Sequence, residues 1–329
     1  MNGLVRVAVL MGGPSEEHEI SLKSGHGVTD ALRHRGWAAQ PVVIPKTASV
    51  KEACAFVERV LRQSRADVAF LALHGTFGED GTIQQLCESL SVAYTGSDAR
   101  ASRLGMDKVA SRKRFEASGL AVPPWHVVER ARHSPASVSR WLRQHQWPYP
   151  MVVKPTDQGS SIGVSVVRAE QDLPDALKAA GRYSAQMLIE QFVQGREVTV
   201  GILGAMPLPV VEIRPHQPFF DFTAKYTVGM TDYLVPAPLE PDLAARVQAA
   251  GLAAHRALGC RHLSRTDLIL TRDGVPVVLE VNTIPGFTPT SLLPKAAAYI
   301  QISYDEICEQ LIAMALQDHP QAARETAHV

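Results

Sequence analysis

Residues 265–282, RTDLILTRDGVPVVLEVN, have the pattern of a β-hairpin. Two apolar runs flank Asp273 and Gly274, and Asp-Gly is a dipeptide that supplies positive φ at both centres of a type I′ turn. Because strand side chains alternate between faces, a turn at these two residues predicts one core-facing surface. That surface would consist of Thr266, Leu268, Leu270, Val277, Leu279 and Val281.

The opposite face of the predicted hairpin carries two acids. The same turn places Asp267 directly across from Glu280, and Arg265 across from Asn282. Two carboxylates about 5 Å apart repel by roughly 3 kcal/mol at an effective dielectric near 20. One interpretation is an ion-pair face, in which Arg265 neutralises one acid and solvent screens the other. The other is a metal site, which we favour because Asn282 adds an oxygen ligand and the run VVLEV buries Glu280 in an apolar strand. An all-oxygen set of this kind suits Mg²⁺.

The composition bounds the class of protein. A chain of 329 residues is long enough for two or three domains and a large core. Its 33 basic and 33 acidic residues balance, so we expect neither nucleic acid nor a membrane as a partner. The four cysteines lack metal-ligand spacing and read as reduced thiols of a cytoplasmic protein. The opening run, MNGLVRVAVLMGG, reads as a first strand, since its apolar stretch is too short for a membrane span and no signal cleavage site follows.

From residue 5 to about residue 96, short apolar runs alternate with helix-like stretches. This alternation predicts βαβ units and an open, mostly parallel sheet. Ligands of such sheets gather at the carboxyl ends of the strands. The stretches GGPSEEHEIS and HGTFGEDG follow the first and third predicted strands, so we expect function there.

Two further units follow along the chain. A basic helical stretch and a small α+β unit occupy residues 98–193, and a unit with longer strands occupies residues 194–329. The second of these contains an excursion over residues 214–238 that is rich in proline and aromatic residues. Loops of that length in compact domains are often functional.

The stretch VVKPTDQGSSIGVSVV, residues 152–167, predicts a phosphate site. An apolar strand delivers Lys154, and Gly159, Ser160, Ser161 and Gly163 then form a loop rich in hydrogen-bond donors. Backbone N–H groups and hydroxyls of such a loop can surround an anion, to which a lysine adds a point charge. Taken alone, a Gly/Ser segment is more often a simple turn. Beside a lysine and a predicted Mg²⁺ site, nucleotide phosphates become the favoured ligand.

Three other charged residues have a plain and a functional interpretation. Glu190 and Glu197 flank a glycine turn, where they either solvate a hairpin or bind adenine and ribose. Lys108, in the helical stretch MDKVASR, is on general grounds a surface residue.

Eight blocks in this order and spacing resemble D-alanyl-D-alanine ligase of the ATP-grasp superfamily: GGPSEEHEIS, HGTFGEDG, MDK, VVKPTDQGSSIGV, QGREVTVG, FFDFTAKY, SRTDLIL and LEVNTIPGFTPTSLLP. Several blocks are weak individually, but the ordered set is highly specific and spans residues 5–316. The resemblance implies an α/β and α+β fold, in which a Rossmann-like substrate-binding domain (1–97) precedes a two-domain ATP-grasp fold (98–193 and 194–329). It also implies a cytoplasmic homodimer that joins two D-alanines for peptidoglycan synthesis, using ATP and two Mg²⁺ ions, with Mn²⁺ as an alternative metal.

The resemblance assigns the nucleotide and metal ligands by position. Phosphates would contact Lys108, Lys154, the loop of Ser161, and Lys225. Adenosine would contact Glu190 and Glu197. The metal ligands would be Asp267, Glu280 and Asn282, which agrees with the cross-strand argument.

The resemblance also assigns substrate roles. Glu17, with His74 nearby, would bind the ammonium of the first D-alanine, and a hydrogen-bonded set would comprise Glu17, Ser160 and Tyr226. The oxyanion would be stabilised by Arg265 and the backbone N–H of Gly286, and the second substrate's carboxylate would bind Ser291. An acyl phosphate intermediate must be kept from water, so the 214–238 excursion is expected to be a lid. Its aromatic residues are Phe219, Phe220, Phe222, Tyr226 and Tyr233.

Alternatives remain at this point. Another ATP-grasp ligase would carry different residues at Glu17, Tyr226 and Ser291, and a regulatory nucleotide-binding protein would not need Arg265. The Lys225-Tyr226 pair fits ligases that take D-alanine as second substrate, whereas D-alanyl-D-lactate or D-alanyl-D-serine formation is the alternative activity. One departure from the family pattern is Arg112, where a lysine is common; the charge is kept.

Overall fold

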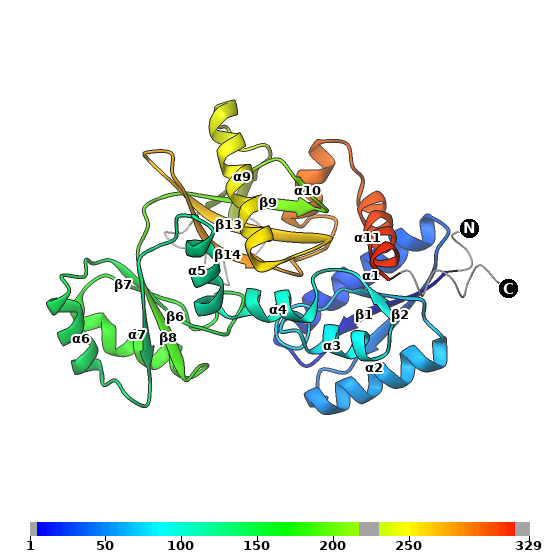
Figure 1. Ribbon diagram of the computed structural model, residues 1–329, viewed down its shortest axis with the longest axis horizontal. Helices are drawn as coiled ribbons and strands as arrows, with labels where there is room; N and C mark the ends of the chain where they lie inside the picture. The colour runs from blue at the N-terminus through cyan, green and yellow to red at the C-terminus, as the bar shows by residue number, and fades with distance from the viewer. Residues whose placement is uncertain (1–4, 217–229, 320–329) are drawn as a thin grey trace.

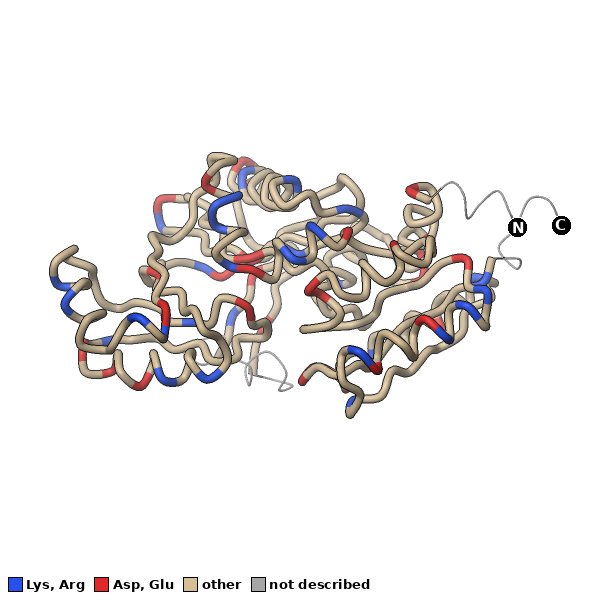
Figure 2. The backbone as a smooth tube through the Cα atoms, turned by 60° about the horizontal axis from the view of Figure 1, so that its bottom comes forward, with Lys and Arg blue, Asp and Glu red and all other residues tan. Residues whose placement is uncertain are grey.

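The computed structural model describes residues 5–216 and 230–319. Three sheets follow one another along the chain, and helices pack against them (Figure 1). Basic and acidic residues are interspersed along the backbone in the view of Figure 2. No helix in these two ranges is long and apolar enough to cross a membrane.

The N-terminal sheet is open and parallel, as the alternating pattern predicts. Its strand order is β2-β1-β3-β4, with parallel pairing throughout. The strands are β1 (Arg6–Gly12), β2 (Ala38–Ile44), β3 (Val68–Leu71) and β4 (Ala93–Tyr94), and the helices are α1 (His18–His34), α2 (Val50–Ser64) and α3 (Thr82–Ser89). Helix α2 begins at a capping box, in which Ser49 and Glu52 satisfy each other's backbone N–H groups. The segment after β1 and the segment after β3 both lie at the carboxyl end of this sheet, where function is expected.

The central sheet is antiparallel, with the order β5-β8-β6-β7. Its strands are β5 (Trp125–Glu129), β6 (Met151–Pro155), β7 (Ser165–Val167) and β8 (Gln186–Gln191). Helices α6 (Pro135–Gln144) and α7 (Leu173–Ala180), with the 3₁₀ turn η2 (Glu170–Asp172) before α7, complete this unit. Its own apolar core includes Met151, Val153 and Ile189. Strand β6 carries Lys154 and β8 carries Glu190, so the central sheet presents both side chains next to the third sheet.

The third sheet has the order β12-β11-β9-β13-β14, and β10 pairs with β9. Its strands are β9 (Gly195–Leu203), β10 (Met206–Pro207), β11 (Val211–Pro215), β12 (Thr231–Leu234), β13 (Leu263–Thr271) and β14 (Pro276–Asn282). The helices of this unit within the described residues are α9 (Pro241–Leu258), α10 (Leu292–Tyr299) and α11 (Tyr304–Asp318). Helix α9 packs against β9, β13 and β14 around a core that contains Val198, Val200 and Leu268.

Two helical segments join the units. Helices α4 (Ala99–Met106) and α5 (Lys108–Ala117) run between the first and third sheets, and Phe115 of α5 is buried in the core under α9. Helix α11 packs against α1, so its residues share a core with the N-terminal sheet. Each sheet falls within one of the three predicted ranges, but the helical packing crosses those boundaries.

The hairpin of residues 265–282 forms, with a different turn from the predicted one. Gly274 donates its N–H to the carbonyl of Thr271 at 3.0 Å, and only Gly274 of the Asp-Gly pair has positive φ, at 74°. The turn is therefore a β-turn followed by a left-handed glycine, which shifts the register by one residue relative to a two-residue type I′ loop. Near the turn, Leu270 accordingly pairs with Pro276.

A β-bulge in β14 then restores the predicted pairs. The register shifts between Asp267 and Leu268, so that Asp267 faces Glu280 while Leu268 faces Val278. Leu279 is the extra residue. The predicted core face is wrong at Val277 and Leu279. Val278 is fully buried under α9, whereas Val277 pairs with Ile269 on the other face and Leu279 lines a cavity.

Candidate active site

Two adjoining cavities contain the residues singled out from the sequence. The first, of about 600 Å³, is lined by residues that include Lys108, Lys154, Ser161, Glu190, Glu197, Asp267 and Glu280. The second, of about 590 Å³, is lined by residues that include Glu17, His74, Ser160, Arg265, Glu280, Asn282, Gly286 and Ser291. Both volumes lie in the range of small-molecule sites. Lys108, Glu280 and Ile213 line both cavities, so the two spaces meet at these residues.

Asp267 is the centre of the polar face of the hairpin. Arg265 donates from Nε and Nη2 to its two carboxylate oxygens, both at 2.8 Å. Asn282 donates from Nδ2 to Oδ2 at 3.0 Å, and Thr199 of β9 donates its hydroxyl to Oδ1 at 2.7 Å. The two-pronged contact fixes the plane of the Arg265 guanidinium at the wall of the second cavity. Thr199 was missed from the sequence, because its pairing with β13 connects residues 68 positions apart.

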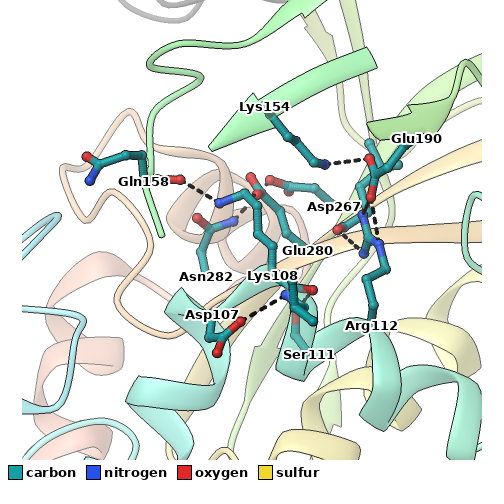
Figure 3. Close-up of polar contacts among 12 residues, drawn as sticks. Asp107, Lys108, Ser111, Arg112, Lys154, Gln158, Glu190, Asp267, Glu280 and Asn282 are labelled. Atoms are coloured by element: carbon teal, nitrogen blue, oxygen red, sulfur yellow. Dashed lines mark hydrogen bonds and ion pairs between the residues drawn. The ribbon is translucent and has the colours of Figure 1, made fainter. Parts of the chain in front are cut away.

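Glu280 lies across the hairpin from Asp267, as predicted, but it is not buried. Its side chain is 29% exposed, and Lys108 Nζ lies 3.8 Å from Oε2. The ion-pair interpretation therefore describes the protein contacts of this face: Arg265 neutralises Asp267, and Lys108 stands beside Glu280. Figure 3 shows Lys108, Glu280, Asp267 and Asn282 converging.

The same residues fit a divalent ion. Within residues 5–216 and 230–319, no group of three or more His, Cys, Asp or Glu side chains is placed to hold a metal. The donor set is instead two carboxylates and the amide of Asn282 at the edge of two cavities. Mg²⁺ takes few protein ligands and completes its octahedron with water and phosphate oxygens. Oxygen chemistry and the neighbouring space for a phosphate both suit this ion.

Lys154 is held by a buried ion-pair cluster. Its Nζ lies 2.6 Å from Oε2 of Glu190, and Arg112 donates from Nε to Oε1 of Glu190 at 2.7 Å. Burial lowers the pKa of Lys154, although the carboxylate of Glu190 opposes the shift. Burial alone would raise the pKa of Glu190, but the charges of Arg112 and Lys154 outweigh it and keep that pKa below its usual value. Glu190 lines the first cavity, and both of its oxygens are engaged by these cations (Figure 3).

The loop between β6 and β7 lies over the junction of the cavities. Lys108 donates from Nζ to the carbonyl of Gln158 at 2.5 Å, and Ser160 donates its hydroxyl to Oε1 of Glu17 at 2.5 Å. Ser160 and Ser161 both have positive φ, at 50° and 58°, which is uncommon outside glycine and occurs at ligand-binding loops. The loop is therefore bonded on one side to Lys108 and on the other to Glu17. Lys108 itself is buried, so the surface interpretation for this residue is wrong.

A second acid of the N-terminal unit was not singled out from the sequence. Glu79 lies in HGTFGEDG, lines the second cavity, and accepts the N–H of Gly75 at 2.9 Å. Burial raises the pKa of Glu79 to about 8, and the nearby Glu17 acts in the same direction. The motif that drew attention to His74 contained Glu79 as well, but its role depends on packing that the motif does not reveal.

His74 is held in one orientation at the second cavity. Its Nε2 lies 2.9 Å from the hydroxyl of Ser24, and its Nδ1 lies 3.1 Å from the carbonyl of Ile284. Burial lowers the pKa of His74, and Glu17 opposes this effect. A neutral ring that donates from Nδ1 and accepts at Nε2 satisfies both contacts.

The far end of the second cavity contains Gly286 and Ser291. Ser291 precedes α10, and its Oγ accepts the backbone N–H of Thr288 at 3.0 Å. Backbone N–H groups at a helix start favour an anion, so the position suits a carboxylate. Lys225, Tyr226 and the aromatic residues Phe219, Phe220 and Phe222 lie outside the described residues. Tyr233 of the expected lid is described and lines the second cavity.

Family models match much of the chain. Residues 115–313 match the model described as D-ala D-ala ligase C-terminus, and residues 47–97 match D-ala D-ala ligase N-terminus. Among curated proteins, a D-alanine–D-alanine ligase from Anaeromyxobacter sp. (strain Fw109-5) is 43% identical over 307 residues, which cover 93% of this chain and 96% of the relative. One from Geobacter sulfurreducens is 42% identical over 312 residues, covering 94% of each.

Solved structures agree with the sequence relatives. The D-alanine–D-alanine ligase from Bacillus anthracis complexed with ATP superposes with a TM-score of 0.82 at 30% identity, covering 96% of this chain and 99% of that one. The VanG D-Ala:D-Ser ligase from Enterococcus faecalis has a TM-score of 0.81 at 28% identity, covering 94% and 99%. With full-length relatives at more than 40% identity and both terminal models matched, the chain belongs to the D-alanine–D-alanine ligase family.

Proposed function

We propose that this protein joins two D-alanines to D-alanyl-D-alanine at the expense of ATP, for peptidoglycan synthesis. The observation that carries the proposal is the meeting of two small-molecule cavities at Lys108 and Glu280. One cavity has the residues expected for a nucleotide and the other those expected for amino acid substrates. A shared wall is what a phosphoryl transfer between bound molecules requires.

ATP is proposed to occupy the first cavity. Its apolar lining, which includes Val152, Ile269 and Leu279, suits an adenine ring. Lys154 lines the first cavity and Lys108 lines both cavities, so their charges would stabilise the phosphates, and the Ser161 loop would add backbone donors. Glu197 lines the same cavity and is proposed to bind the ribose.

Mg²⁺ is proposed to be held by Asp267, Glu280 and Asn282, two ions in all, with Mn²⁺ as an alternative. When bound, the metal would neutralise charge on the transferring phosphoryl group. Hydrogen bonds from Thr199 and Arg265 already hold the Asp267 carboxylate in one orientation at this site.

The first D-alanine is proposed to bind with its ammonium at Glu17. Ser160 fixes one oxygen of Glu17, so the carboxylate has a defined direction at the wall of the second cavity. Phosphorylation of the substrate carboxylate gives an acyl phosphate, a better electrophile than the free acid. The amine of the second D-alanine, after losing a proton, then attacks this carbonyl, and the tetrahedral oxyanion collapses to the peptide bond as inorganic phosphate leaves. A planar guanidinium held by Asp267 and the N–H of Gly286 would stabilise the resulting oxyanion.

The carboxylate of the second D-alanine is proposed to bind at Ser291. D-alanyl-D-lactate or D-alanyl-D-serine formation is the alternative within the family, since a D-Ala:D-Ser ligase shares the fold. The dipeptide activity has the greater support, because curated relatives that are 42–43% identical to this chain carry the D-alanine–D-alanine name. From the resemblance we also propose that the protein is a cytoplasmic homodimer. Light scattering of the purified chain can test whether it is a dimer.

The discriminating assay is phosphate release from ATP and Mg²⁺ with and without D-alanine. We expect stimulation by D-alanine and none by L-alanine, with D-serine and D-lactate as weaker second substrates. If D-alanine gives no stimulation and L-alanine is equally inert, the ligase proposal is wrong.

A further inference from the structure

Arg112 is the largest fully buried side chain in the described parts of the molecule, and its guanidinium contacts two different sheets. On one side it bonds Glu190 of β8, as described above. On the other, Nη1 donates to the carbonyl of Val278 at 3.3 Å and to the carbonyl of Leu279. These two carbonyls belong to the bulge of β14. The Arg112 guanidinium therefore links a carboxylate of the central sheet with the irregular strand of the third sheet.

The bulge decides on which face Glu280 lies. The turn sets a register in which Leu270 faces Pro276 and Leu268 faces Val278. If that register continued, Asp267 would face Leu279, and Glu280 would point to the other face of the hairpin. The one extra residue turns Glu280 to the side of Asp267. A bulge leaves backbone groups outside the regular ladder, and Arg112 donates to the carbonyls of the two residues at this point.

We propose that Arg112 is a positioning residue, which fixes the placement of both the Glu280 carboxylate at the proposed metal site and the Lys154 ammonium at the proposed phosphate site. Through the bulge it fixes the placement of Glu280 relative to Asp267. Through Glu190 it fixes Lys154, which lies 2.6 Å from the same carboxylate (Figure 3). One guanidinium thereby couples the two groups that would receive the phosphates and their metal. The inference rests on the proposed ATP and Mg²⁺ sites.

The planar fork explains why this position is occupied by an arginine in this chain. A guanidinium can donate from Nε to Glu190 and from Nη1 to the bulge at the same time, because its donors point in fixed, separate directions. A lysine ammonium at the same place keeps the charge but has a single nitrogen. Arg112→Lys should therefore preserve the neutralisation of Glu190 and loosen the bulge.

The test compares Arg112→Lys and Arg112→Met in the full-length protein, with Arg114→Met as the matched control. Arg114 lies on the same helix with its side chain in solvent. Binding of the non-hydrolysable analogue adenylyl imidodiphosphate is measured by calorimetry over a range of free Mg²⁺, alongside steady-state kinetics. Arg112→Met is expected to weaken analogue binding about 10- to 100-fold, the range typical of residues that orient metal ligands. Arg114→Met should match the parent protein.

Arg112→Lys separates the effect on Glu190 and Lys154 from the effect on the β14 bulge and Glu280. It also tests the proposal if Arg112→Met does not fold. It is expected to keep analogue affinity at saturating Mg²⁺ within about twofold, while the Mg²⁺ concentration for half-maximal binding rises about threefold to tenfold. Parent-like Mg²⁺ dependence in Arg112→Lys would overturn the proposal, as would an Arg112→Met protein that loses thermal stability alone. A parent protein that needs no Mg²⁺ would instead contradict the proposed metal site, so the two failures are distinguishable.

Discussion

Replacing Glu190 by glutamine tests the buried cluster through stability alone, without any assumption about turnover. The carboxylate is 3% exposed and contacts Arg112, which is 0% exposed, and Lys154, which is 10% exposed. Glutamine keeps the shape but removes the charge that the two cations share. Removing one partner from a buried ion pair costs about 3–5 kcal/mol. Two cations left roughly 5 Å apart repel by about 3 kcal/mol at an effective dielectric near 20, a value of the same size.

Glu212→Gln is the matched control for Glu190→Gln. Glu212 is also a buried carboxylate between two cations, Arg196 and Arg214, but these are 37% and 52% exposed. Water can solvate the charges of these two arginines when Glu212 is neutral, so we expect the free energy of unfolding to fall by about 1 kcal/mol or less. The assay is urea unfolding of both variants and the parent near pH 7, with the free energy of unfolding extrapolated to water. A loss in Glu190→Gln no larger than that in Glu212→Gln would refute the reasoning.

The pH dependence of Glu190→Gln supplies an internal check. Because the folded pKa of Glu190 is lowered, its ionised form stabilises the fold above the pKa of an unfolded glutamate, about 4.5. This contribution is lost as the pH falls through the folded pKa. The difference in stability between parent and variant should therefore be full at neutral pH and shrink in acid. A difference that stays constant down to the acid limit of folding would count against an electrostatic origin.

Three further substitutions test single residues of the site. Glu280→Gln should abolish turnover with an unchanged melting temperature, because the lost charge weakens Mg²⁺ binding; near-normal activity at saturating ATP would remove Glu280 from the metal site. Ser160→Ala removes the hydroxyl bonded to Glu17, and D-alanine saturation curves should show kcat/KM lowered about tenfold or more, as expected for a hydrogen bond to a charged group; unchanged curves would contradict the role. Glu79 has a folded pKa of about 8, so the folded protein keeps a proton that the unfolded chain releases above about pH 4.5, and stability falls as pH rises across that window. Melting temperatures from pH 5 to 8 should fall less in Glu79→Gln than in the parent. If the two proteins lose the same melting temperature over this range, the pKa of Glu79 is not raised.

The hairpin illustrates how far sequence reasoning reaches. The cross-strand partners of Asp267 and Arg265 were predicted correctly from a turn that does not form. The left-handed glycine turn moves the register by one residue, and the bulge at Leu279 moves it back. Alternating hydrophobicity cannot detect this compensation, because Val278 and Leu279 are both apolar. The local sequence pattern identified the polar face of the hairpin, whereas the turn and the bulge that produce this face were seen only in the structure.

The missed residues share a different cause. Arg112 meets Glu190 over 78 positions in sequence and the bulge carbonyls over 166 or 167. Thr199 meets Asp267 over 68 positions. No local motif indicates such contacts. By contrast, the open parallel sheet follows from a short-range pattern, the alternation of apolar runs with helix-like stretches, and it was predicted correctly.

The central claim is that ATP activates the carboxylate of one D-alanine for attack by the amine of another. It is tested most directly with D-alanine labelled with ¹⁸O in its carboxylate, incubated with the protein, ATP and Mg²⁺. An acyl phosphate that loses phosphate to an attacking amine leaves one substrate oxygen on the inorganic phosphate. We predict that phosphate carrying one ¹⁸O forms in step with D-alanyl-D-alanine, as mass spectrometry can measure. Dipeptide formation with unlabelled phosphate, or phosphate release without dipeptide, would contradict the account.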